Sequence, residues 1–109
     1  MSNEEFEQLC YWCEDQELTA VWGWICDIGG AFDEQKERFF GVLYRLLLEG
    51  RIRLIHMHTR VPMKGAIEEQ IALYRAAFPR DEIAMNGGLW FLTEACPCGS
   101  AWQHSDDAA

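Results

Sequence analysis

No apolar run in these 109 residues approaches the roughly 18 residues that a membrane-spanning helix needs. The N-terminus also lacks the basic character of a signal peptide, because Glu4 and Glu5 follow directly after the first three residues. No low-complexity segment interrupts the chain, and half of its residues are hydrophobic. We therefore expect a single domain, residues 1–109, that works in the cytosol and does not bind a membrane.

Sequence motifs typical of enzymes are absent as well. The chain has no phosphate loop, dinucleotide fingerprint, zinc-protease helix or nucleophile elbow. We therefore assign no catalytic residue and no cofactor, and we expect a binding protein rather than an enzyme.

Lysine and arginine are missing from the first third of the chain. Residues 1–35 hold nine of the 18 acidic residues and none of the nine basic ones, whereas residues 36–109 hold nine of each. The net charge of -9 therefore belongs entirely to the N-terminal segment. A surface of one sign attracts a cationic protein and repels nucleic acid. The alternative is a solvated acidic surface that only aids solubility.

The middle of the chain predicts a helix that leads into a strand. Apolar side chains recur three and four residues apart at Phe39, Phe40, Leu43, Leu46 and Leu47. This spacing predicts one buried stripe on a helix. Gly50 suits the left-handed position just after a helix, and Ile52 and Leu54 then alternate with arginines as in a strand.

Shorter elements pack on both sides of this pair. Ser2 and Glu5 fit a capping box for the first helix, and Asp15 and Asp33 fit N-caps for the next two. The predicted helices are about 3–14, 17–28, 33–49 and 66–78, and the predicted strands are about 51–57, 89–94 and 100–103. A turn at 96–99 joins the last two strands. The expected fold class is α+β, mainly helical with a small antiparallel sheet.

The five cysteines are an odd number, and in a reducing cytosol free thiols are the default. Four of them could in principle hold zinc: Cys10, Cys13, Cys96 and Cys98. The first two lie in the apolar stripe of a helix, which favours buried, inert thiols. His56 and His58 would share one face of a strand, but a third ligand is not evident nearby. We therefore predict no metal site.

Aromatic residues in the acidic segment are the strongest candidates for a binding site. Trp22 belongs to an apolar stripe, whereas Trp12 and Trp24 fall off the stripes and lie among carboxylates. Exposed aromatics with acidic neighbours suit a basic protein partner. Burial under other helices or in a dimer is the alternative. The predicted partner-binding residues are Glu7, Tyr11, Trp12, Glu14, Asp15, Glu17, Trp24 and Asp27.

Several segments in the second half carry a resemblance to a known family. These are 47–54 (LLEGRIRL), 65–71 (GAIEEQI), 75–79 (RAAFP), 89–92 (LWFL) and Cys96-Pro97. In order and spacing they resemble the bacterial domain of unknown function 596 family. Some members of that family are immunity proteins of contact-dependent growth inhibition or related polymorphic toxin systems. The resemblance implies such a role and supplies no catalytic residues.

The leading hypothesis is therefore an immunity protein that binds the C-terminal domain of a cognate toxin, for which a basic nuclease is the favoured candidate. Two alternatives stay open. A winged-helix-like DNA-binding regulator could use Arg45, Arg51, Arg53 and Arg60 as a basic strip, although the net charge opposes it. A small zinc or redox thiol protein is the other.

Overall fold

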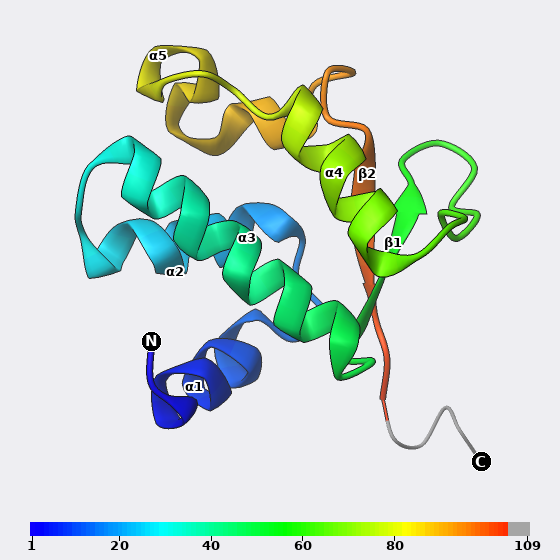
Figure 1. Cartoon of the computed structure of the whole chain (residues 1–109), viewed down its shortest axis with the longest axis horizontal. Helices are drawn as coiled ribbons and strands as arrows, with labels where there is room; N and C mark the ends of the chain where they lie inside the picture. The colour runs from blue at the N-terminus through cyan, green and yellow to red at the C-terminus, as the bar shows by residue number, and fades with distance from the viewer. Residues whose placement is uncertain (105–109) are drawn as a thin grey trace.

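A long central helix, α3 (Phe32–Leu48), leads directly into the first strand, β1 (Ile52–His56), as predicted (Figure 1). Helices α1 (Asn3–Cys13) and α2 (Leu18–Ile28) precede it. After β1 come α4 (Ile67–Ala77), α5 (Glu82–Met85), the 3-10 helix η1 (Asn86–Leu92) and strand β2 (Cys98–Trp102). This computed structural model describes residues 1–104, and the predicted α+β class is confirmed. Within that range, no helix has both the length and the apolar character needed to cross a membrane.

Gly50 ends α3 as the sequence predicts. Its φ of 71° is left-handed, which glycine adopts without a Cβ clash. The Gly50 N–H donates to the Leu47 carbonyl (3.1 Å), and the Arg51 N–H donates to the Leu46 carbonyl (2.9 Å). These are the two bonds of a Schellman motif. The motif satisfies two terminal carbonyls and directs the chain into β1.

The start of α1 is also confirmed, whereas two predicted N-caps are wrong. Ser2 and Glu5 form the full capping box of α1. Asp15, however, lies in the turn between α1 and α2 with a left-handed φ of 64°, which aspartate tolerates better than most residues. Glu17 takes the N-cap position of α2 without a side-chain hydrogen bond. Asp33 lies inside the first turn of α3, where its carboxylate complements the helix dipole.

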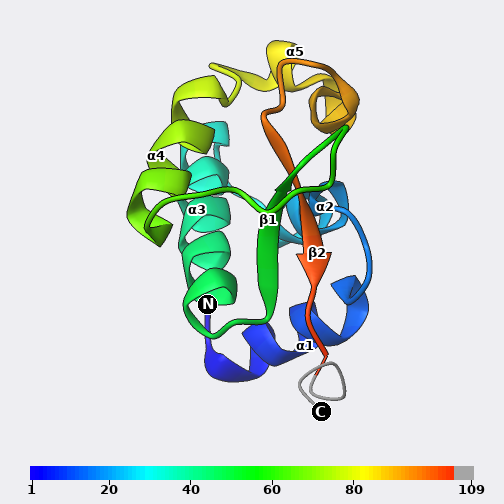
Figure 2. The same cartoon turned by 90° about the vertical axis from the view of Figure 1, so that its right-hand side faces the viewer.

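The sheet does not contain the predicted C-terminal hairpin. Strand β2 pairs antiparallel with β1, from Ile52 opposite Trp102 to His56 opposite Cys98. Figure 2 shows the two strands side by side, although α4, α5 and η1 separate them in sequence. Because Cys98 and Gly99 belong to this ladder, β2 begins two residues before the predicted strand and the predicted turn at 96–99 is wrong.

Residues 89–94 form no strand, which corrects a second prediction. Asn86, Gly87 and Gly88 have φ values of 53°, 64° and 99°, so the chain kinks there. Trp90 and Phe91 are then both buried, while Leu89 and Leu92 are 55% and 61% exposed. Consecutive residues of a strand point to opposite faces, whereas exposed residues three apart match the period of a 3-10 helix. The helical form buries both large rings.

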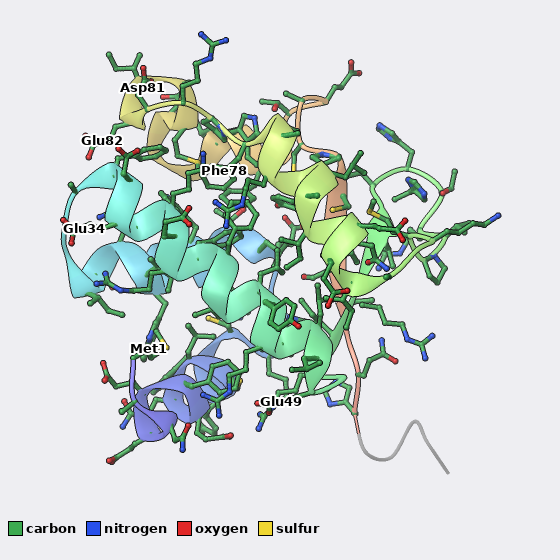
Figure 3. All side chains as sticks on the ribbon, viewed as in Figure 1. Met1, Glu34, Glu49, Phe78, Asp81 and Glu82 are labelled. Atoms are coloured by element: carbon green, nitrogen blue, oxygen red, sulfur yellow. The ribbon has the colours of Figure 1, made fainter. Side chains whose placement is uncertain are left out.

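An aromatic cluster at the meeting point of α2, α3, α4 and η1 forms the centre of the core. Phe39 is fully buried, and its ring contacts five others, those of Trp22, Phe40, Tyr74, Phe78 and Phe91. Figure 3 labels Phe78 at the end of α4, next to α3. Ring centroids in these pairs lie 5.4 to 6.2 Å apart, in tilted or edge-to-face arrangements that aromatic pairs favour.

Replacement of Phe39 by alanine should lower the free energy of unfolding by about 3–5 kcal/mol, because it removes these contacts and leaves a cavity. Urea denaturation followed by tryptophan fluorescence measures the change. The matched control is Leu73→Ala on α4, where the side chain is 53% exposed. That variant should lose less than about 1 kcal/mol. Equal losses in the two variants would contradict a core centred on Phe39.

Candidate functional site

The solvent-facing side of α1 presents an exposed aromatic pair between carboxylates. Phe6, Leu9, Cys10 and Cys13 take the buried side. Tyr11 is 75% exposed and Trp12 is 64% exposed, and their rings meet edge to face with centroids 5.3 Å apart. We call the residues on this side and in the following turn the α1 surface: Glu7, Tyr11, Trp12, Glu14, Asp15 and Glu17.

Two arginines, Arg45 of the central helix and Arg51 in the turn just before β1, hold α1 in place. The Arg45 guanidinium lies 3.8 Å from the centroid of the Phe6 ring, and that of Arg51 lies 5.5 Å away. Arg51 also bridges Glu7 (2.6 Å) and Glu49 (3.1 Å). The two arginines hold the pKa of Glu49 below its usual range, chiefly through the hydrogen bond from Arg45. Because Arg51 pairs with Glu7, the negative charge of Glu7 is partly compensated.

The end of β2 fixes the turn that follows α1. The His104 ring contacts the carboxylates of Glu14 (Nδ1 to Oε1, 3.0 Å) and Asp15 (Nε2 to Oδ1, 2.8 Å). The Trp102 indole N–H donates to the Gln16 carbonyl (2.8 Å). These contacts hold the acidic turn in place, and Arg45 and Arg51 hold the helix that carries the aromatic pair. Glu17 is exposed and makes no ion pair within residues 1–104.

Two of the predicted binding residues belong to a different helix. Trp24 and Asp27 are in α2, where Trp24 is half-buried and packs against the core while Asp27 is exposed. No ring contact within residues 1–104 joins Trp24 to Tyr11 or Trp12. The six other predicted residues lie together on α1 and the turn after it.

Three residues at this surface escape detection in the sequence: Arg51, Trp102 and His104. They are 44, 86 and 89 positions away from their partners Glu7, Gln16 and Asp15. Local periodicity carries no information on contacts at such separations. The packing of α1 against the end of α3 brings Arg51 to Glu7, and the pairing of β2 with β1 brings Trp102 and His104 to the turn after α1.

The cysteines resemble core residues more than reactive groups. Cys10, Cys13, Cys96 and Cys98 are all buried. Burial raises the pKa of the Cys13 thiol to about 11 and raises those of the other three. Since the thiolate is the nucleophile and the metal ligand, these thiols are poorly suited to redox or zinc chemistry at neutral pH. This observation weighs against a redox or zinc function.

The two histidines do not share a strand face as predicted. Strand β1 ends at His56, and His58 lies in the turn that follows. Both line a cavity of about 480 Å³, together with Met57, Leu92 and Cys96 among others. Within residues 1–104, no three His, Cys, Asp or Glu side chains are grouped in a way that could hold a metal ion.

Half of the predicted basic strip for DNA is neutralised by ion pairs. Arg45 pairs with Glu49 at 2.7 Å, and Arg51 pairs with Glu49 and Glu7. Arg53 and Arg60 remain without an ion pair in the described part of the chain. Two isolated arginines on a protein of net charge -9 give little affinity for phosphate.

Residues 47–109 match the family described as "Protein of unknown function, DUF596". The chain belongs to this family. The match begins at the end of α3 and includes β1, α4 and β2, so the α1 surface lies outside it. The family description states no activity and identifies no site residues.

The fold is shared with a solved structure, an uncharacterised protein conserved in bacteria from Neisseria meningitidis. The two superpose with a TM-score of 0.82 at 24% sequence identity. The alignment covers 97% of this chain and 84% of that one, so α1 and α2 are part of the common fold. No curated protein matches the chain.

Alkaline pH should destabilise the protein through its buried thiols. Below the ordinary thiol pKa of 9.0, Cys13 is protonated in both the folded and the unfolded chain, and its contribution to stability is fully present. As the pH rises from 9.0 through about 11, the unfolded chain loses its proton first, so the free energy of unfolding falls. Urea denaturation across this pH range measures the slope. Cys13→Ala should make it shallower, whereas an identical slope would contradict the shift assigned to Cys13.

Proposed function

We propose that this protein is a cytosolic immunity protein that binds the C-terminal domain of a cognate toxin and covers its active or substrate-binding site. The observation that carries the proposal is the exposed Tyr11–Trp12 pair on an acidic helix. The resemblance of the chain from about Phe39 to Trp102 to a family with immunity members supports the same role. The protein acts by occlusion and catalyses no reaction.

Charge on the N-terminal segment favours a basic partner, with a nuclease domain as the most direct candidate. Residues 1–35 contain no lysine or arginine that could cancel its nine carboxylates from within the segment. Arg51 compensates Glu7 in part, and the His104 ring contacts Glu14 and Asp15, while Glu17 adds an exposed charge without an ion pair in residues 1–104. Such a field increases the rate of encounter with a cationic surface.

Tyr11 and Trp12 supply the short-range part of the interaction. Large aromatic side chains are over-represented among interface residues whose truncation costs most binding energy. Their exposure is costly in the free protein, and burial against a partner removes that apolar area from water. The carboxylates would thus govern the association rate, and the aromatic pair would govern the dissociation rate.

An affinity purification from the cells that produce the protein tests the proposal. The full chain serves as bait at low and moderate salt, and mass spectrometry identifies the eluate. We expect the C-terminal part of a large secreted protein in near-equal amount, and the purified complex should lack the toxic activity of the free domain. Recovery of no such domain, or one that stays active when bound, would reject the immunity role.

Truncation of the aromatic pair should weaken that complex. Trp12→Ala and Tyr11→Ala should each raise Kd by about 30-fold, the effect of a loss of about 2 kcal/mol. Leu92→Ala is the control, since Leu92 is 61% exposed and lies in η1 rather than on the α1 surface. Isothermal titration calorimetry measures Kd for the wild-type protein and for each of the three variants. A larger effect at Leu92 than at Trp12 would place the interface elsewhere.

Charge reversal should act on the association rate. Changing Glu14, Asp15 and Glu17 to lysine should slow association sharply at low ionic strength and less at high, because salt screens steering. The control triple converts Glu69, Glu82 and Glu94, which are exposed in α4, α5 and the loop before β2, and changes the net charge equally. Stopped-flow mixing compares the two triples. An equal effect of both would mean that net charge matters and that this segment does not steer.

A further inference from the structure

The sheet has one covered edge and one open edge. Beyond β1, the chain folds back and covers its outer edge: the His56 N–H donates to the Val61 carbonyl, and the Met63 N–H donates to the Leu54 carbonyl, both at 2.9 Å. A bridge between Ile55 and Pro62 belongs to the same cover. Strand β2 has β1 on one side and no second strand on the other within residues 1–104 (Figure 2).

The register identifies the backbone groups at the open edge. The Gln103 N–H donates to the Arg51 carbonyl (2.8 Å), so the odd-numbered residues of β2 exchange hydrogen bonds with β1. The even-numbered residues Cys98, Ser100 and Trp102 consequently direct their N–H and C=O groups away from β1. Cys98 conforms to this pattern, because its carbonyl accepts from the Cys96 thiol (3.3 Å).

This edge lacks the features that normally block strand pairing. Proteins protect open edges with lysine, proline, bulges or charged side chains. Strand β2 reads Cys-Gly-Ser-Ala-Trp, with no charged residue and no proline among its five residues. No side chain of β2 is therefore of a type that blocks a further strand, and residues 99–102 are half-buried rather than fully covered.

A cavity lies along the same edge. It has a volume of about 280 Å³, and its walls come from the α1–α2 turn, the start of α2, residues 98–100 of β2, Ile55 of β1, Met57 and Arg60 in the turn after β1, and Phe91 of η1. The Thr19 and Ser100 hydroxyls, from two residues that line it, are buried and have no hydrogen-bond partner among the described residues. A buried hydroxyl without a hydrogen bond is unfavourable. The two hydroxyls could therefore form hydrogen bonds with a bound molecule.

We propose that the open edge of β2 binds an extended segment of the partner protein as a third strand, with alternating apolar and basic side chains. Leu18, Met57 and Phe91 line the cavity and would contact the apolar side chains. Asp15 and Glu17 outnumber Arg60 among its charged lining residues and would attract the basic ones. A second copy of this chain is disfavoured, because its own β2 carries no basic side chain to complement Asp15 and Glu17.

This inference rests on the proposed function, in that the partner is a basic protein, but it concerns a separate contact. Tyr11 and Trp12 are on α1, whereas the strand edge is Cys98–Trp102. If Trp12→Ala weakens the toxin complex and a block of the β2 edge does not, the immunity role stands and the strand pairing is overturned.

The test uses the full-length protein and a defined peptide probe. The probe is acetylated, amidated Val-Lys-Val-Lys-Val, added in the millimolar range, where weak strand pairing is detectable. Amide hydrogen exchange by NMR should show Ser100 and Trp102 exchanging fast in the free protein, with Gly99 and Ala101 protected by β1. At a peptide concentration about ten times Kd, exchange at Ser100 and Trp102 should slow about tenfold. The absence of any change at these amides would overturn the proposal.

Controls separate backbone pairing from charge. A peptide N-methylated on the amides that would face β2 should not bind, and Val-Glu-Val-Glu-Val should bind more weakly. Ser100→Pro should abolish binding and still fold, because the N–H it removes points away from β1. Ser100→Ala should retain binding. The inference would be overturned if the methylated peptide bound as well as the unmethylated one. It would also be overturned, in favour of self-pairing, if Ser100 were protected without peptide and this protection rose with protein concentration.

Discussion

Phe39 is the residue on which the arrangement of the helices depends. Its buried ring contacts rings from α2, α4 and η1 as well as its own helix, so removal of this one side chain affects four elements at once. Because aromatic pairs have preferred distances and angles, the cluster restricts how α4 and η1 can lie on α3. It also explains why 86–92 is helical: two adjacent rings, Trp90 and Phe91, must both reach this cluster.

The α1 surface depends on a different set of interactions. Helix α1 buries its apolar face, and its position is set by Arg45 and Arg51 over the Phe6 ring and by the end of β2 at the following turn. Most of these contacts are polar and partly exposed, so each contributes little to stability. Their role is to orient the helix. A fixed orientation lowers the entropic cost of presenting Tyr11 and Trp12 to a partner.

The strand order connects this surface with the open sheet edge. Since β1 is covered on its outer side by residues 61–63, β2 is the strand within residues 1–104 that keeps outward-facing backbone groups, and its edge runs beside the acidic turn after α1. A basic partner that meets α1 would therefore find strand-pairing groups next to the charges that attract it. Two contacts of moderate strength on one rigid partner reinforce each other, because the second forms at high effective concentration.

The sequence by itself determined the elements with local signals and the exposure of Trp12, whereas Trp24, which also falls off a stripe, is half-buried against the core. The capping box at Ser2, the left-handed Gly50 and the stripe around Phe39 follow from spacing within a few residues, and Trp12 is exposed because it falls off such a stripe. Tertiary structure alone decided that 89–92 is helical, that β2 pairs with β1, and that His104 reaches Asp15 across 89 positions. These outcomes depend on which long-range contacts bury most apolar surface, a competition that no local window contains.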